Sequence, residues 1–307
     1  MREKYHLSNI PILALCLVFL FSCNIQHKND ASTSSPQIYK KTDGYIVTDT
    51  VIKGFTFVFV PKGIYTFGMN DDLKSIDYDY WIMKFEVTNE QYAHFLNDAL
   101  VNKRILLKND TVLYPYSGDH IRPKGVYHAM MPDGKISYVN GSFLVDSGYE
   151  QHPVTCLTWF GCRAFCDYTG FELPDQYEWE KAARGATGWN YPWGDTLNFR
   201  RANYHFSKDP FSEGTTPVGF YNGQQYQGFQ TIDSPSPYGC YDMAGNAWEV
   251  TNSTIYPDRG FIEGGGGGYL YHTGAMTQSW FRSRFGYPIP SRIDRAFISD
   301  GFRCMIK

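Results

Sequence analysis

The clearest local signal is Leu173-Pro-Asp-Gln-Tyr-Glu-Trp-Glu-Lys-Ala-Ala-Arg-Gly185, which begins with a capping pattern and ends on glycine. Asp175 is followed three residues later by Glu178, and the two side chains of such a capping box can each accept a hydrogen bond from an unpaired backbone amide. Trp179 would share the buried side with the two alanines, while Gly185 supplies the stop signal. The stretch therefore predicts a short, well-capped helix.

Two further helices are predicted upstream of this stretch. Residues 159–168 place aromatic residues and cysteines at helical spacing, and Gly170 follows at the expected C-terminal stop. Nearer the N-terminus, Thr88 or Asn89 can cap a helix that runs to about Leu100, because a short polar side chain there accepts a hydrogen bond from one of the first amides.

Short strands surround the predicted helices. Residues 55–60 and 64–69 indicate two strands around a turn, and residues 80–87 indicate a third. Residues 101–150 alternate short apolar pieces with Gly, Asp and Pro, which we interpret as an irregular insertion with hairpins. No repeat and no second boundary occurs, so the sequence predicts one domain over residues 51–307.

Composition excludes several classes of protein. The chain is 43% hydrophobic and 17% aromatic, enough for a sizeable core, and its net charge of −3 gives no basic surface for nucleic acid. The glycine run 264–268 lacks the strand-to-helix context of a phosphate-binding loop. Cysteine and histidine spacings that would build a zinc site do not occur.

The N-terminal segment has the features of a targeting sequence. Two basic residues precede the apolar stretch 10–21, which is too short to span a roughly 30 Å hydrocarbon core and suits a signal peptide over residues 1–22. It closes on a sequence that resembles a bacterial lipobox, with Cys23 as the acylated residue. The polar residues 23–50 would form a tether. We expect a lipid-anchored protein of the bacterial cell envelope, in the outer membrane. The alternative is a plain secretion signal with an incidental cysteine.

Ten blocks in order resemble the formylglycine-generating enzyme family, also called the sulfatase-modifying-factor family. The blocks are Val60-Pro-Lys-Gly63 through Phe67-Gly-Met69, Glu86-Val-Thr-Asn89, His152-Pro-Val154 with Thr158-Trp159, Phe165-Cys166, Leu173 through Gly185, Tyr191-Pro-Trp-Gly-Asp195, Ala202-Asn-Tyr204, Thr216-Pro-Val-Gly219, Tyr238-Gly-Cys-Tyr-Asp-Met-Ala-Gly-Asn-Ala-Trp-Glu249 and Gly301-Phe-Arg-Cys304. The resemblance implies a single α+β domain of low regular secondary structure, related to C-type lectin-like domains.

The resemblance also implies a chemistry that this chain does not match. The family enzyme oxidises a cysteine of a sulfatase peptide to formylglycine, using oxygen and a copper ion held by two cysteines. Tyr271 and Met276 occupy those two positions, and Gly268 replaces a family serine. No cysteine lies between Cys240 and Cys304, so neither thiolate ligand is present. We therefore expect no copper and no formylglycine synthesis.

Calcium is the metal that the resemblance favours, at two loops where the ion would fix the backbone. The first predicted set is Asp242, Gly245, Ala247 and Glu249, and the second, less regular in length, is Asn203, Tyr204, Asp209 and Phe211. In the alternative interpretation, these residues only cap turns in a loop-rich fold.

A ligand groove and a disulfide are implied in the same way. The groove positions are Trp248, Tyr271, His272, Arg282 and Arg284, where aromatic walls and arginines could hold an extended peptide or a glycan. Alternatively, Trp248 belongs to the core and the arginines form structural ion pairs. The family disulfide maps onto Cys166 and Cys304, whereas the three other cysteines of the domain would be buried thiols. Those three cysteines are Cys156, Cys162 and Cys240.

Two functional hypotheses follow. The first is a non-catalytic lipoprotein that acts as a binding or scaffold module for a peptide, protein or glycan of the envelope. The second is a formylglycine-generating oxidoreductase, or another metal-dependent enzyme of the family, with a substitute centre. A carbohydrate-binding module is a third idea, which rests on the lectin-like fold alone.

Overall fold

The computed structural model describes residues 36–40, 46–68, 70–109, 111–130, 133–211, 214–256, 261–268, 291–292 and 294–307. The helices in these residues are α1 (Asn89–Val101), α2 (Trp159–Thr169) and α3 (Gln176–Arg184). All three helices predicted from the sequence are therefore present, with bounds within a few residues of the expected ones.

The caps explain why the helices begin and end where they do. Thr88 caps α1 through a capping box in which its side chain accepts from the Gln91 amide, and the Gln91 side chain accepts from Thr88. Asp175 and Glu178 form the predicted capping box of α3. Gly170 ends α2 with φ +75°, a left-handed conformation that glycine adopts without strain.

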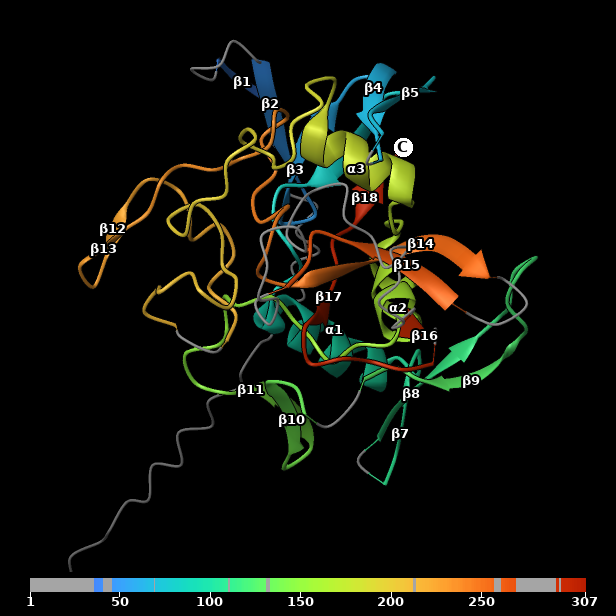
Figure 1. The fold of residues 1–307 in the computed structure, drawn as a ribbon. Coiled ribbons are helices and arrows are strands. Elements are labelled where there is room, and N and C mark those ends of the chain that lie inside the picture. Colours follow the sequence, from blue (N-terminus) through green and yellow to red (C-terminus); the bar gives the residue numbers. More distant parts are fainter. Residues whose placement is uncertain are drawn as a thin grey trace, which may run out of the picture.

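The first of two larger sheets has the strand order β1-β2-β3-β6-β18 (Figure 1). Its strands are β1 (Gln37–Lys40), β2 (Ile46–Ile52), β3 (Phe55–Val60), β6 (Tyr80–Met83) and β18 (Met305–Ile306). All neighbouring strands pair antiparallel. Strand β18, near the C-terminus, forms one edge of the sheet beside β6. The third predicted strand ends earlier than expected, at Met83.

The second larger sheet has the order β16-β15-β14-β17. Its strands are β16 (Ser291–Arg292), β15 (Phe261–Gly265), β14 (Trp248–Tyr256) and β17 (Asp300–Gly301). Because β17 pairs parallel with β14 and β18 pairs with β6, residues 300–306 connect the two sheets. Arg303 lies between these two pairings.

Small sheets complete the described fold. They are β4 (Gly63–Phe67) with β5 (Asp72–Ile76), β7 (Leu106–Lys108) with β8 (Thr111–Tyr116) and β9 (Gly125–His128), β10 (Ile136–Val139) with β11 (Ser142–Val145), and β12 (Gln225–Tyr226) with β13 (Phe229–Gln230). The predicted insertion 101–150 thus contains hairpins, as expected, but it is not peripheral. Its residues Tyr114, Tyr116 and Phe143 are buried in the main core.

Regular structure begins earlier than the predicted domain start at residue 51. Strand β1 lies wholly within the predicted tether 23–50 and pairs with β2, which begins at Ile46 and pairs with β3. Residues 37–40 and 46–50 of the predicted tether therefore belong to the sheet, and Val47 is buried. The predicted signal peptide 1–22 and Cys23 lie outside the described residues. Among those described, no helix is long and apolar enough to cross a membrane.

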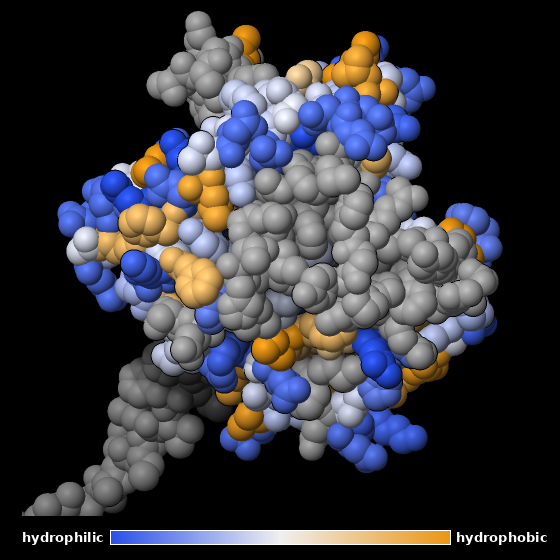
Figure 2. Space-filling model, in the orientation of Figure 1, coloured by the Kyte–Doolittle hydropathy of each residue, from blue (hydrophilic) through white to orange (hydrophobic). Residues whose placement is uncertain are grey.

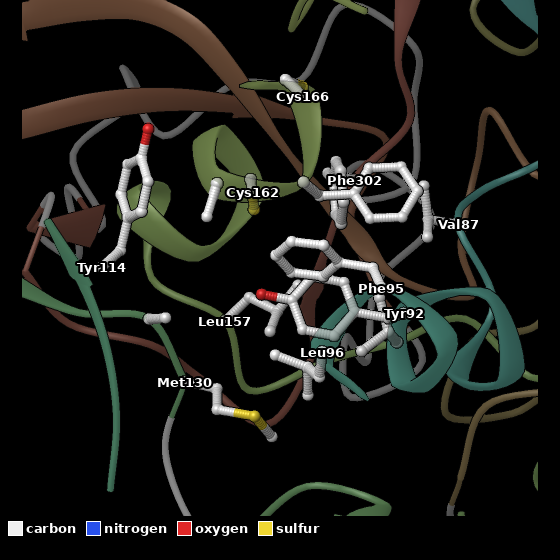
Figure 3. Packing of buried hydrophobic residues seen from close by; sticks show 14 of the residues in the cluster. Val87, Tyr92, Phe95, Leu96, Tyr114, Met130, Leu157, Cys162, Cys166 and Phe302 are labelled. Atoms are coloured by element: carbon white, nitrogen blue, oxygen red, sulfur yellow. The ribbon is translucent and has the colours of Figure 1, made fainter. Parts of the chain in front are cut away.

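Two clusters of buried side chains form the core. The larger one joins α1 and α2, and Figure 3 shows Tyr92 and Phe95 of α1 beside Phe302. The ring of Phe165 in α2 lies 5.5 Å from that of Phe95 and 5.9 Å from that of Tyr92, measured between centroids. The smaller cluster packs α3 through Trp179 and two alanines against the first sheet. Helices and strands contribute side chains to the same buried clusters, which confirms the predicted α+β class.

Candidate functional site

A buried ion pair lies where the chain's C-terminal block meets the predicted calcium loop. The Arg303 guanidinium is fully buried and pairs with both carboxylate oxygens of Glu249, at 2.7 Å from Nε to Oε2 and 2.6 Å from Nη2 to Oε1. Trp179 Nε1 also donates to Glu249 Oε2, at 2.9 Å. The remaining guanidinium hydrogens reach backbone carbonyls, including those of Met83 and Tyr241. Every partner in this pair is therefore hydrogen-bonded.

Two more buried carboxylates lie near this pair. Glu86, just before α1, accepts from Asn246 Nδ2 at 2.8 Å and from the Ala247 amide at 3.0 Å. Asp242 accepts from the Gly219 amide at 2.6 Å. Both side chains hold a loop by satisfying backbone or amide donors that water cannot reach.

The buried carboxyl groups around Arg303 outnumber the positive charges beside them. Burial, and then the negative charges of Asp242 and Glu249, raise the pKa of Glu86 well above its usual range, although Arg303 opposes the shift. Burial likewise raises the pKa of Asp242, to about 6. Three carboxyl groups share one buried guanidinium, so the site favours either a bound proton or an additional cation.

The first predicted calcium loop is positioned by unusual backbone angles. Asp242 and Asn246 have φ of 58° and 62°, and Gly245 has φ +84°. A Cβ on Gly245 would meet the Asn203 carbonyl oxygen at 2.2 Å, and the Asn246 amide donates to that same oxygen at 2.9 Å. The two predicted calcium loops therefore touch one another, which their separation in sequence did not reveal.

The second predicted loop is also held by protein donors. Asp209 accepts from Ser207 Oγ at 2.5 Å, from Tyr221 OH at 3.0 Å and from the Phe211 amide at 2.9 Å. Asn203 donates to the Gly214 carbonyl at 2.8 Å. These hydrogen bonds cap turns of the loop, which is what the alternative to calcium binding expects.

In the described part of the chain, no three His, Cys, Asp or Glu side chains are arranged to hold a metal ion, either at the predicted calcium loops or elsewhere. A calcium ion at the first loop would therefore draw on Asp242 and on the backbone carbonyls of Gly245 and Ala247, since Glu249 is already paired with Arg303. The excess of buried carboxyl groups over buried cations favours such an ion. The pairing of Glu249 with Arg303 disfavours it, because one predicted ligand is already occupied.

The predicted groove is described at only one position. Trp248 is 6% exposed, and its amide donates to the Ser299 carbonyl at 2.7 Å, which agrees with the alternative that it belongs to the core. The other groove positions, and the copper-ligand position Met276, lie outside the described residues. These positions are Tyr271, His272, Arg282 and Arg284.

The cysteines lie where the resemblance implied. Cys166 and Cys304 are both buried, with their sulfur atoms 3.5 Å apart, as thiols rather than as a disulfide. A disulfide needs about 2.05 Å between sulfurs, so the bond itself stays a prediction. Cys156, Cys162 and Cys240 are buried thiols, as predicted. Burial raises the pKa of Cys156 to about 11, which disfavours the reactive thiolate.

Glu86 and Arg303 are the two site residues for which the sequence analysis predicted no role. Both lie within recognised blocks, and both are charged residues between apolar neighbours. A charge in such a position needs a buried partner, which is the signal that could have singled them out. The partners could not have been named, because they lie 54 to 220 positions away in sequence.

A mixed α+β domain with this C-terminal block and this ion-paired loop defines a recognised class, that of sulfatase-modifying-factor domains. The chain belongs to the FGE-sulfatase family: residues 44–307 match the model of the Sulfatase-modifying factor enzyme 1-like domain. The match begins two residues before β2, so it includes that strand of the first sheet but not β1.

Several curated proteins are similar to parts of this chain. The formylglycine-generating enzyme of Thermomonospora curvata is 30% identical over 186 residues, 55% of this chain and 57% of that protein. The inactive C-alpha-formylglycine-generating enzyme 2 of Mus musculus is 36% identical over 109 residues, 34% of this chain and 33% of that protein. The serine/threonine-protein kinase pkn1 of Chlamydia pneumoniae is 30% identical over 192 residues, 59% of this chain but 24% of that protein.

One solved structure supports the fold over most of the chain. PvdO from Pseudomonas aeruginosa aligns with a TM-score of 0.54 at 18% identity, covering 89% of this chain and 98% of that one. At that identity the likeness shows the fold alone. The single family domain predicted from the sequence blocks is thus confirmed.

Proposed function

We propose that this protein is a non-catalytic lipoprotein of the cell envelope, in which the family domain serves as a binding or scaffold module for a peptide, protein or glycan. The observation that carries the proposal is the lack of any cysteine between Cys240 and Cys304. Tyr271 and Met276 stand at the copper-ligand positions, and a phenol with one thioether is a poor site for Cu(I) beside two thiolates. A family relative that is named inactive supports the idea that the domain persists without the chemistry.

The first prediction concerns activity. The full chain, incubated with a Cys-x-Pro-x-Arg peptide, oxygen, reductant and copper, is expected to leave the peptide cysteine unchanged, because both thiolate ligands are missing. Mass spectrometry of the peptide measures the loss of thiol and gain of aldehyde. The Thermomonospora curvata enzyme, assayed beside it, is the positive control.

Conversion of the peptide would contradict the proposal and favour the second hypothesis, an oxidoreductase with a substitute centre. In that event Met276→Ala tests whether the thioether is the substitute ligand. Loss of conversion in this variant would assign the centre to Met276, and retained conversion would place the centre elsewhere in the chain.

We propose calcium as a structural ion at the first loop. The support is the surplus of buried carboxylates around Arg303, which a divalent cation would offset. Calcium at about a hundred times its dissociation constant stabilises a protein by about 2.7 kcal/mol. For a domain of this size, that corresponds to a rise of roughly 5 to 10 °C in melting temperature.

The second prediction is therefore a calcium-dependent melting temperature. It is checked by differential scanning calorimetry in EDTA and in excess calcium, with Asp242→Ala, which removes the side-chain oxygens, as the variant that should lose most of the shift. Magnesium serves as a control, because it prefers a stricter octahedral set of ligands. Equal melting temperatures with and without calcium would contradict the proposal and leave the loop held by hydrogen bonds within the protein.

We also propose that Cys23 carries a lipid anchor, supported by the apolar segment before it and the polar segment after it. The third prediction is that Cys23→Ser abolishes incorporation of a labelled fatty acid and releases the protein from membranes. Cys16→Ser, within the predicted signal peptide, is the matched control and should change neither. Unaltered labelling of Cys23→Ser would favour the plain secretion signal.

A further inference from the structure

The β12–β13 hairpin itself carries no charged side chain, and charged residues occur at its borders, at Arg200 and Asp233. The stretch Tyr221-Asn-Gly-Gln-Gln-Tyr-Gln-Gly-Phe-Gln-Thr-Ile232 contains no Asp, Glu, Lys or Arg, although 19% of the chain is charged. Its four glutamines are exposed, and Tyr226 and Phe229 are half-buried between them. Figure 2 shows orange residues set among blue ones over this part of the molecule, at the left of the view.

The two rings of the hairpin pack against the buried ring of Phe220. Phe220 is buried, and its ring centroid lies 4.5 Å from that of Tyr226 and 6.2 Å from that of Phe229. Phe199, from a separate segment, lies 6.2 Å from Phe229 at an interplanar angle of 62° and remains 43% exposed. We call Phe199, Tyr226, Phe229 and the exposed glutamines the hairpin surface.

The hairpin surface is fixed in place before any ligand arrives. Asn222 Nδ2 donates to the Tyr226 hydroxyl at 2.9 Å, which holds that ring. The amide and hydroxyl of Thr231 both donate to the Gln224 carbonyl, at 3.0 and 2.7 Å. Arg200 Nε donates to a β13 carbonyl at 2.6 Å. A surface that is already ordered loses little entropy on binding.

We propose that the hairpin surface binds a neutral oligosaccharide. Pyranose rings present C–H faces that pack against aromatic rings, and the planar amides of glutamine both donate and accept hydrogen bonds with hydroxyl groups. The hairpin surface contributes no charged side chain to pair with a phosphate, a sulfate or a charged peptide, and the bordering Arg200 donates its Nε to the Gln230 carbonyl. This proposal rests on the proposed function, because it names a ligand class for the binding module. No residue of the hairpin surface belongs to the predicted groove or to the copper-ligand positions, so its failure is separable from that of the copper argument.

The test is titration calorimetry of the full chain, kept in a detergent without a sugar head group. The probes are neutral hexasaccharides of three linkages: cellohexaose, laminarihexaose and maltohexaose. We expect at least one to bind, and Phe199→Ala to weaken it by about tenfold, the loss of one ring contact near 1.4 kcal/mol. Because Phe199 is already exposed, its truncation should leave the fold intact.

Two control variants separate stacking from folding. Tyr226→Phe keeps the ring and loses only the hydroxyl, so affinity should stay within a few fold. Tyr177→Ala removes a ring of similar exposure, 39%, from α3. Because α3 lies well away from β12 and β13 in Figure 1, this variant should leave the affinity for the hexasaccharide unchanged. The double variant Phe199→Ala/Tyr226→Ala should lose binding while its melting temperature shows that it remains folded.

Three outcomes would overturn the proposal. The first is that none of the three hexasaccharides binds at millimolar concentration. The second is that a hexasaccharide binds equally well to the folded double variant, which would place the site elsewhere. The third is that only charged chains such as heparin or polygalacturonate bind, since the hairpin surface offers them no ion pair.

Discussion

Replacing Arg303 by methionine is expected to lower the free energy of unfolding by about 3 to 5 kcal/mol, the usual cost of breaking a buried ion pair from one side. The substitution leaves Glu249 buried without its guanidinium and removes the positive charge that opposes the raised pKa of Glu86. It also removes the hydrogen bonds that Arg303 donates to the backbone carbonyls of Met83 and Tyr241. Urea unfolding followed by circular dichroism measures the loss.

Two further variants show which property of Arg303 matters. Arg303→Lys keeps the charge but cannot bond both oxygens of Glu249 at once, so an intermediate loss is expected. Combining Arg303→Met with Glu249→Gln removes the stranded charge and should recover part of the stability lost in the single variant. A loss below about 1 kcal/mol in Arg303→Met would show that the pair does not hold the two sheets together, against the prediction.

The position of Arg303 explains why this pair is more than a local contact. Residues 300–306 run from the second sheet to the first, and Arg303 lies between these two pairings. Glu249 belongs to β14, which pairs with β17 at the same place. The pair therefore fixes the crossing point of both sheets, next to the loop that carries Asp242.

Local signals in the sequence predicted the helices well. The capping box at Asp175 and Glu178 and the stop at Gly170 depend on residues within one or two turns, and such patterns can be read directly. The same holds for the family blocks, whose order gave the fold. Strand β2 could not be predicted in the same way, because Ile46–Ile52 does not alternate polar and apolar residues and follows a polar segment.

Long-range contacts could not be predicted from spacing. Glu86 reaches Asn246 across 160 positions, and Arg303 reaches Glu249 across 54. Residues 101–150 showed no period because their strands are three to six residues long, too short for a pattern. The contact of Gly245 with Asn203 depends on a backbone approach that no side-chain pattern records.

Gly161→Ala is expected to destabilise the protein by about 2 kcal/mol or more, even though alanine is favoured over glycine in helices by about 1 kcal/mol. A Cβ at this position in α2 would lie 2.0 Å from the Ala129 carbonyl oxygen and 3.0 Å from the Tyr92 hydroxyl. The oxygen belongs to the backbone and accepts from the Thr158 amide at 3.1 Å, so it cannot move aside without loosening the start of α2.

The control for Gly161→Ala is Gly134→Ala, where the added Cβ would make only ordinary contacts, at 3.5 Å and beyond. That variant should change the free energy of unfolding by less than about 0.5 kcal/mol, the usual range for a substitution that disturbs nothing. Thermal melting of both variants beside the parent protein measures the difference. If Gly161→Ala proved as stable as the parent, α2 would have to sit farther from Ala129 than the structure places it. The packing of α1 on α2 through Tyr92 would then need revision as well, since its hydroxyl donates to the Gly161 carbonyl at 3.1 Å.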